Sequence, residues 1–459
     1  MSVGSSEKPP VNRAKFATNL GVLAATLGSA VGLGNIWKFP YLTGSNGGAA
    51  FLLVYIICML LIGIPVMVSE LTLGRAARSN AIATMQKLSP ARQPWWLIGA
   101  AGVLAAFLIM AFYSEVAAWV FAYIFKAIQG GILSTDPEVT KSAFNGLVGN
   151  PTQSLIWQWI DLAVVGFIIL LGVNKGIESA TKKLMPILLG LLILVGIRSI
   201  TLPGAGQGLT FLFQPDFTKL TAASFLIAMG LAFFKLSVGM GTMITYGSYF
   251  RDDQDIPGTA FRVAFSDLAV SLLAGIAIFP AVFAFGYQPN AGPSLLFLTI
   301  PSVFASMPLG NIFMVIFFIL TAIASIGAQI SLVEVPVAFL EEKFHLSRQK
   351  ASIITVLSIV LVGSLAALSN STLADVKLFG MTFFDLFDYT TSNILLPLGG
   401  LFIAIFISWI WGYKKLSAAL SNNGQLSNQG IIKVFYGTLL VVTPVLVTIV
   451  LLNGLKIIQ

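Results

Sequence analysis

The chain has 459 residues, of which 57% are hydrophobic and only 10% are charged. Its mean hydropathy of +0.90 lies far outside the range of soluble globular proteins and indicates a membrane protein. The single cysteine excludes an intrachain disulfide, and the single histidine excludes a multi-histidine metal site.

Apolar stretches long enough to cross a hydrocarbon core recur along the whole chain, and each is expected to be helical. Hydropathy predicts eleven spans and no separate soluble domain, with the polar segment 130–153 as an external loop and 289–308 as a short external helical hairpin. The residues before Phe16 are polar, so no signal peptide is expected. In chain order the spans are 17–41, 47–74, 92–129, 154–173, 177–200, 218–250, 257–286, 308–342, 346–368, 382–413 and 430–456.

Positive charge is divided unevenly between the two sets of loops. The loops on the side of the N-terminus carry most of the lysines and arginines, whereas the opposite loops carry few, among them Lys141, Lys219 and Lys377. This asymmetry places the N-terminus in the cytoplasm, and an odd number of spans then places the C-terminus outside the cell. The net charge of +8 is therefore a topology signal of an inner-membrane protein, and nucleic acid is not expected as a partner.

Two glycine-rich segments interrupt the first and sixth spans at the same depth: "AVGLG" begins at Ala30 and "SVGMG" at Ser237. Paired glycines each cost roughly 1 kcal/mol in a helix relative to alanine, and they free backbone groups that lipid cannot satisfy. A single glycine-rich segment would be explained by close packing between helices. Two such segments at matching places in the two halves instead favour broken helices around a binding site at the membrane midplane, as in inverted-repeat transporters. The chain 1–459 then forms a single domain, with 17–200 and 218–413 as the repeats and 430–456 as an additional helix.

Six motifs are specific enough to be compared with known families. They are "GSAVGLGNIWKFPYLTGSNGGAAF" (28–51), "GIPVMVSELTLGR" (63–75), "FYSEVAAW" (112–119), "ITYGSYFRDDQDI" (244–256), "SLVEVPVAFLEE" (331–342) and "FDLFDYTTSNILLPLGG" (384–400). Together the chain resembles the bacterial neurotransmitter:sodium symporter family, the LeuT-like transporters. The resemblance implies an all-α integral membrane fold with a 5+5 inverted repeat and broken helices 1 and 6.

The missing twelfth span and the stretch from Gly176 to Pro186 are most similar to the family's eleven-span branch, which includes a transporter of multiple hydrophobic amino acids. In that branch the Gly176 to Pro186 stretch is an unwinding hinge that admits water to the inner site.

The resemblance also implies an amino-acid site at the two breaks. Amides at Leu33 and Gly34 and the Tyr113 hydroxyl hold the substrate carboxylate in the family, which suits the positive end of a helix dipole. Gly32 leaves room for that carboxylate where monoamine carriers place an aspartate. The amino group is taken by backbone around Ala30, Phe234 and Ser237. The side-chain pocket suits a neutral aliphatic or aromatic group, although helix packing alone would explain each of its residues; they are Ser29, Ile109, Phe234, Met240, Ala328 and Leu332.

Gates at both ends of the pathway are implied as well. Lys38 with Asp388 matches the outer charged pair, with lysine in place of the more common arginine, so bidentate geometry is lost. Phe234 and Tyr113 match the aromatic lid over the site. The inner pair is matched by Arg13 and Glu342, with Tyr249 nearby. Surface ion pairs contribute about 0–1 kcal/mol, which suits gates that open repeatedly.

The first sodium site departs from the family. There, backbone at Ala30, the Asn35 side chain, the substrate carboxylate, a hydroxyl and an amide hold the ion, but the last two positions are here Lys235 and Asp267. A lone buried charge is expensive, so we expect these two residues to pair. Lys235 then acts as a tethered cation in the site, facing the substrate carboxylate. Glu115 is the alternative partner for Lys235.

The second sodium site is also altered. In the family it uses backbone at positions matching Gly28, Val31 and Ala324, together with two hydroxyls from the eighth span. Gly327 and Ala328 occupy the hydroxyl positions, so the site is expected to be degraded. Lys183 offers a replacement cation from the fifth span, while the simpler interpretation of this lysine is a loop charge.

These features predict a secondary transporter of neutral amino acids that works by alternating access in the lipid bilayer, with no cofactor. Sodium dependence is expected to be weak or absent, and protons are a candidate coupling ion, exchanged by Lys235 in one hypothesis. A conventional symporter with altered ligands, which requires Na⁺, is the first alternative. A non-transporting membrane sensor is the second, and intact gates at both ends argue against it. No nucleophile–base pair or metal cluster indicates an enzyme.

Overall fold

The computed structural model describes residues 26–171 and 173–455, without the side chains of 171, 173–185, 453 and 454. Within these ranges the regular structure is helical, apart from one isolated bridge between Leu378 and Met381. Eight helical runs among the described residues are long and apolar enough to cross a membrane. They are Ala49–Ala77, Trp96–Gln129, Pro151–Leu170, Ile256–Ala284, Gly310–Phe344, Arg348–Asn370, Phe383–Trp411 and Gln429–Leu452.

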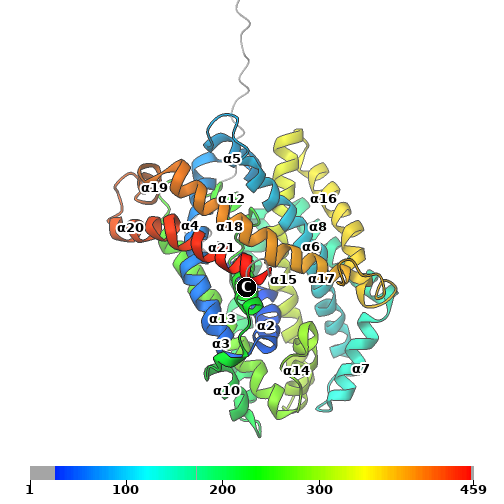
Figure 1. Ribbon diagram of the computed structural model, residues 1–459. Coiled ribbons are helices and arrows are strands. Elements are labelled where there is room, and N and C mark those ends of the chain that lie inside the picture. Colours follow the sequence, from blue (N-terminus) through cyan, green and yellow to red (C-terminus); the bar gives the residue numbers. More distant parts are fainter. Residues whose placement is uncertain (1–25, 172, 456–459) are drawn as a thin grey trace, which may run out of the picture.

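These runs correspond to labelled helices in Figure 1. Five of them rest on one α-helix each: α6 (Trp96–Gln129), α8 (Pro151–Leu171), α13 (Ile256–Ala284), α15 (Gly310–Phe344) and α16 (Arg348–Ala367). In the other three, short π-helical turns join α3 (Ala49–Cys58) to α4 (Ile64–Ala77), α17 (Phe383–Tyr389) to α18 (Leu396–Ile405), and α20 (Gln429–Gly437) to α21 (Thr443–Gly454).

A further span is α9 (Val173–Ile200), which turns by 117° into α10 (Ala205–Phe213). Two more spans, the first and the sixth of the chain, are interrupted helices. The first span is helical over 26–30, bends at 31–32, and continues through η1 (Gly34–Lys38) and α2 (Phe39–Ser45). The sixth consists of α11 (Ala222–Lys235) and α12 (Thr242–Gly247). These three segments of the described chain fall within the remaining three of the eleven spans expected from hydropathy.

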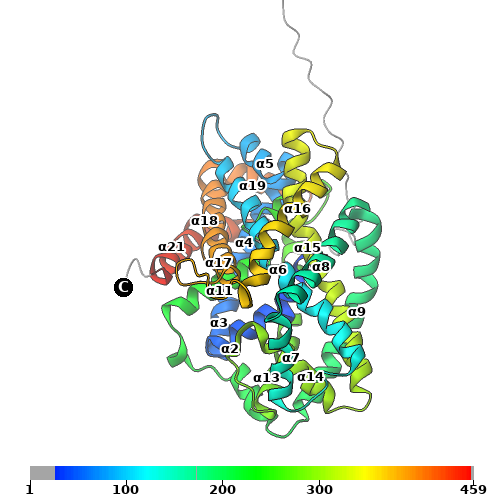
Figure 2. The same cartoon turned by 90° about the vertical axis from the view of Figure 1, so that its right-hand side faces the viewer.

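The helices pack so that the interrupted ones lie inside the bundle. The long helices α6 and α15 run side by side through its centre, α8 and α16 lie against them on one side, and α21 lies at the opposite edge (Figures 1 and 2). Residues of the described parts of the interrupted helices are almost all buried, whereas α16 exposes apolar side chains such as Leu357 and Leu361 to lipid. The core therefore encloses the two breaks.

Connecting elements gather at the two ends of the bundle. The short helices α5 (Ala81–Leu88) and α19 (Tyr413–Leu420) lie at one end, and α7 (Pro137–Val148), α10 and α14 (Leu295–Ala305) lie at the other (Figure 1).

Two expectations for the connecting segments were wrong. Segment 130–153 is not a plain loop, because Asp136 caps α7 by accepting from the Glu138 amide, and Pro137 suits the first helical position. Segment 289–308 is not an external hairpin: a 3-10 turn (Gly292–Ser294) leads into the single helix α14. Because α14 is apolar on all sides, it is buried between α7, α13 and α15.

Candidate functional site

The break in the first helix frees backbone amides that side chains then satisfy. The Gly32 amide donates to Asn35 Oδ1 at 3.1 Å, and the Leu33 amide donates to the Tyr113 hydroxyl at 3.2 Å. Two of the three residues expected to hold a substrate carboxylate, Leu33 and Tyr113, are thus already in contact across helix 1 and α6. An exposed helix N-terminus beside a hydroxyl is a binding site for an anionic group.

The break in the sixth helix is a stretch of unusual backbone between α11 and α12. Ser237, Gly239 and Gly241 have φ angles of 53°, 78° and 72°. A Cβ at Gly239 would lie 2.6 Å from the Leu396 carbonyl oxygen, so only glycine fits there. The Gly239 amide donates to Glu70 Oε1 at 2.7 Å, which anchors the unwound segment to α4.

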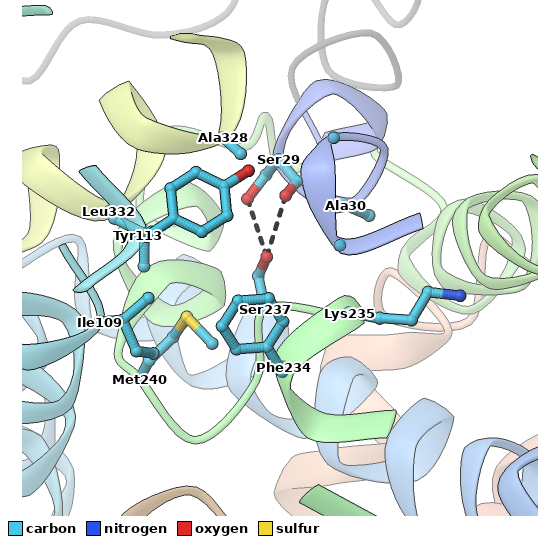
Figure 3. A pocket seen from close by; sticks show the side chains of 12 residues that line it. Ser29, Ala30, Ile109, Tyr113, Phe234, Lys235, Ser237, Met240, Ala328 and Leu332 are labelled. Carbon is cyan, nitrogen blue, oxygen red and sulfur yellow. Dashed lines mark hydrogen bonds between the residues drawn. The ribbon is translucent and has the colours of Figure 1, made fainter. Parts of the chain in front are cut away.

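The two breaks are joined by a pair of serines. The Ser29 hydroxyl donates to the Ser237 hydroxyl at 3.1 Å, and Ser237 in turn donates to the Ser29 carbonyl at 3.1 Å (Figure 3). Hydrogen bonds between hydroxyls and backbone therefore replace the missing helical bonds at the midplane.

A pocket lies between the breaks, α6 and α15 (Figure 3). It contains every residue expected around the substrate except Leu33, whose amide instead contacts the lining residue Tyr113. The lining is Ser29, Ala30, Gly32, Gly34, Ile109, Tyr113, Phe234, Lys235, Ser237, Met240, Ala328 and Leu332. Apart from the serines and Tyr113, this lining is mostly apolar, which suits an apolar side chain.

The pair expected at the outer gate is closed over this pocket. Lys38 forms a buried ion pair with Asp388 and donates to the Ser392 hydroxyl at 2.9 Å. Its ammonium also lies 3.9 Å from the centre of the Phe234 ring. Lys38 thus ties the lid residue Phe234 to α17.

At the other end, the described residues form a network around Glu334 and Glu342. Glu342 accepts from the Asn80 amide and side chain at 3.0 and 2.7 Å, while its expected partner Arg13 lies outside the described residues. Tyr249 donates to Glu334 at 2.9 Å, and Arg348 pairs with the same carboxylate at 2.7 Å. Arg348 was not predicted to belong to this network, although its place at the start of the helix after Glu342 is a signal for such a pairing.

At the first ion site, Lys235 and Asp267 form a fully buried ion pair with 2.9 Å between Nζ and Oδ2. The ammonium also donates to the Tyr55 hydroxyl at 3.0 Å and to the Ser271 hydroxyl. All three N–H groups are therefore used.

One expectation about Lys235 was wrong. Its side chain extends away from the pocket, toward α3 and α13, so the ammonium does not face a substrate carboxylate (Figure 3). The reason is that its oxygen partners Tyr55, Asp267 and Ser271 all lie on those two helices. Only the aliphatic stem of Lys235 borders the pocket.

Asn35 completes this cluster. Its amide group donates to Asp267 Oδ1 at 2.7 Å and to the Ser271 hydroxyl at 3.0 Å, while its oxygen accepts from Gly32. The alternative partner for Lys235, Glu115, instead accepts from the Trp119 indole at 2.6 Å.

At the second ion site, backbone carbonyls remain and hydroxyls do not. A Cβ at Gly327 would lie 3.4 Å from the Gly28 carbonyl, and one at Gly32 would lie 3.4 Å from the Ala324 carbonyl, so both oxygens face the gap between helix 1 and α15. The Val31 amide is used within the helix, where it donates to Leu27. Gly327 and Ala328 face this gap without side-chain oxygens.

The proposed hinge is helical in this structure. Gly176 and Pro186 both lie within α9, with Pro186 inside the helix. Unwinding between them stays a prediction.

Membrane-spanning helices that are broken around a buried pocket, with ion pairs on both sides of it, define a transporter of the LeuT type. The chain belongs to the sodium:neurotransmitter symporter family, whose profile matches residues 13–137 and 144–459.

Individual relatives match over nearly the full length. An uncharacterized sodium-dependent transporter of Bacillus subtilis, YhdH, is 41% identical over 98% of both chains. An uncharacterized sodium-dependent transporter of Haemophilus influenzae is 35% identical over 96% of this chain and 98% of its own. The crystal structure of MhsT in complex with L-phenylalanine has a TM-score of 0.92 and 44% sequence identity, and the match covers 96% of this chain and 100% of MhsT.

Proposed function

We propose that this protein is a secondary transporter of neutral amino acids with hydrophobic or aromatic side chains. The observation that carries this proposal is the contact between the Leu33 amide and the Tyr113 hydroxyl at the break of helix 1. Both groups can donate to a carboxylate, and Tyr113 together with Gly32 and Gly34 on either side of Leu33 lines an apolar pocket. The L-phenylalanine complex of MhsT supports a substrate of this class.

Closed and buried ion pairs around a pocket support alternating access. Lys38 with Asp388 and the Glu334 network must open at different times for a substrate to pass. We take 17–200 and 218–413 as the repeats that rock against each other. The loop charges favour an inner membrane protein with a cytoplasmic N-terminus and an external C-terminus.

Substrate binding is proposed to need no sodium at the first site. The Lys235 and Asp267 pair is neutral overall and already occupies the side-chain positions that hold sodium in the family. Asn35 is also engaged on both its oxygen and its nitrogen. A sodium ion entering this cluster would therefore have to displace hydrogen bonds already made.

A conventional sodium symporter is the second candidate. The carbonyls of Gly28 and Ala324 still face the second site, and the relatives in Bacillus subtilis and Haemophilus influenzae are named sodium-dependent. The two candidates differ in whether binding saturates with sodium at constant ionic strength.

The test is binding and uptake of a labelled amino-acid panel by the purified protein in proteoliposomes. Sodium and proton gradients are imposed one at a time, and ionic strength is held constant with an organic cation. We expect hydrophobic amino acids to bind without sodium, and the Lys235→Thr/Asp267→Asn double variant to acquire sodium dependence. Lys219→Thr, on an exposed lysine, is the matched control.

Saturable sodium dependence in the wild type that the double variant leaves unchanged would establish the conventional symporter instead. Binding of no amino acid at all would point to the sensor alternative.

A further inference from the structure

A stripe of polar side chains runs along one face of α8 inside the bundle. Ser154, Gln158 and Asp161 follow one another at helical spacing, and each is at most 1% exposed. The other side of the same helix exposes apolar groups such as Trp159 and Phe167 to lipid. Polar residues within a span are expensive to bury and mark functional positions.

Two neighbouring helices present polar groups to this stripe. From α6, the Ser114 hydroxyl accepts from the Gln158 amide group at 3.1 Å, and the next residue is the buried acid Glu115. From α15, the Gln329 amide group donates to Asp161 Oδ1 at 2.9 Å. The buried acids Glu115 and Asp161 thus share one polar region between α6, α8 and α15.

Each acid has one carboxylate oxygen with a hydrogen-bond partner and one without. Glu115 Oε1 accepts from the Trp119 indole, but Oε2 has no hydrogen-bond partner. Asp161 Oδ1 accepts from Gln329, but Oδ2 has none. The carbonyl oxygens of Gln158 and Gln329 are also unpaired, whereas the Ser154 hydroxyl faces Glu115 and carries its own donor. Four fully buried oxygens in one region therefore lack a hydrogen-bond partner.

No lysine, arginine or histidine of the described chain pairs with either acid. The groups that face them are Tyr113 and Trp119 from α6, Ser154 and Gln158 from α8, Gln329 from α15, and the Gly363 carbonyl from α16, which accepts from Gln158. The titratable members of this set are the two acids and Tyr113. An unpaired buried carboxylate costs several kcal/mol, and two that share a site repel each other.

Protonation of the two acids removes the unpaired negative charge and supplies the missing donors. A protonated carboxyl group carries no charge and gains an O–H donor, which an orphan oxygen such as Gln158 Oε1 or Gln329 Oε1 can accept. A metal ion would leave the acids charged and would add no donor.

We propose that Glu115 and Asp161 form a proton-binding acid pair behind the substrate pocket, and that its protonation is coupled to transport. Two residues connect it to the pocket: Tyr113 is two positions before Glu115 on α6, and Ala328 adjoins Gln329 on α15. Movement of either wall of the pocket therefore alters the donors around the acids. The coupling part of this inference rests on the proposed transport function, whereas the proton site does not.

The first experiment needs no substrate. Difference infrared spectroscopy of the full-length protein in lipid measures the C=O stretch of protonated carboxyl groups. The Glu115→Gln and Asp161→Asn variants each replace an acid with an uncharged amide of the same shape. We expect each variant to lose the part of this band that comes from the replaced carboxyl group. Glu138→Gln, at an exposed position of α7, is the control and leaves the band unchanged. A band that neither variant changes would overturn the proton site.

The second experiment measures uptake of labelled phenylalanine in sodium-free proteoliposomes with a pH gradient. A one-proton symporter accumulates substrate about tenfold per pH unit. We expect the wild type and Glu138→Gln to accumulate substrate, and the other two variants to keep binding and counterflow exchange while losing accumulation. Accumulation that persists in both variants would overturn the coupling, as would a wild type driven by a sodium gradient alone.

Failure of the proposed function has a different signature. The wild type would then bind none of the amino acids, although the infrared band and its loss in the two variants would remain.

Discussion

The Lys235 and Asp267 pair makes a strong prediction about stability. Both side chains are 0% exposed and lie 2.9 Å apart. An Asp267→Asn variant leaves the ammonium buried with two hydroxyl partners and no counter-ion, and breaking a buried pair in this way costs about 3–5 kcal/mol. We expect a value near the lower end, because Tyr55 and Ser271 remain and two aromatic rings lie 4.8 Å from the ammonium.

The reciprocal change gives a similar loss. Lys235→Met removes the cation, but Asp267 still accepts from Asn35 at 2.7 Å and from Tyr55 at 3.2 Å. The Lys235→Met/Asp267→Asn double variant removes both charges at once. Replacing a buried pair with uncharged groups of similar size is often neutral, so the double variant is expected to be more stable than either single variant.

The assay is thermal unfolding of the purified protein in detergent, followed by tryptophan fluorescence. Membrane proteins often unfold irreversibly, so the order of the transition temperatures at one scan rate is compared rather than free energies. Asp216 and Lys219 form an exposed pair with 3.7 Å between charged atoms, and Asp216→Asn is the control, which is expected to leave the transition temperature nearly unchanged. A double variant with the summed loss of the two singles, or an unaffected Asp267→Asn variant, would refute a coupled buried pair.

Two further predictions concern the pocket. Tyr113→Phe removes the hydroxyl that contacts the Leu33 amide, and losing a hydrogen bond to a charged group costs about 1.5–3 kcal/mol, so amino-acid affinity should fall about tenfold to a hundredfold in a radioligand assay. Unchanged affinity would remove Tyr113 from the carboxylate site. Lys38→Gln breaks the ion pair with Asp388 and frees the ring of Phe234, so the bound amino acid should dissociate faster in a filter-binding chase. A dissociation rate equal to that of the wild type would show that this pair is not a gate.

Much of the architecture was readable from the sequence because lipid imposes a simple requirement on the backbone. A helix must be about 20 apolar residues long, and interruptions survive only where they line a cavity. These two constraints predicted the spans and, with the glycines of 30–34 and 237–241, the two breaks, which in the structure begin at Val31 and Leu236. The helix α7 was missed because its amphipathic pattern is short, and its N-terminal signals, Asp136 and Pro137, were read as loop residues.

The direction of the Lys235 side chain could not be predicted in the same way. Its position in the helix follows from the chain, but its orientation depends on where the Tyr55 and Ser271 hydroxyls lie after α3 and α13 have packed. The polar stripe of α8 is a different case. Its helical spacing was present in the sequence, but the apolar residues between Ser154 and Asp161 concealed it in a hydropathy average.

The balance of charge in the interior connects the two proposals. Under the proposed function, an amino acid enters the pocket as a zwitterion, and both nearby ion pairs, Lys38 with Asp388 and Lys235 with Asp267, are neutral overall. Binding at such a site changes no net charge, so the Lys38 pair can close the gate, and the Lys235 pair can stay formed behind the pocket, without drawing on an ion gradient. Glu115 and Asp161 are not balanced by any cation of the described chain, so a mobile positive charge must reach them. Energy coupling is therefore expected behind the pocket, between α6, α8 and α15, rather than at the position where relatives hold their first sodium ion.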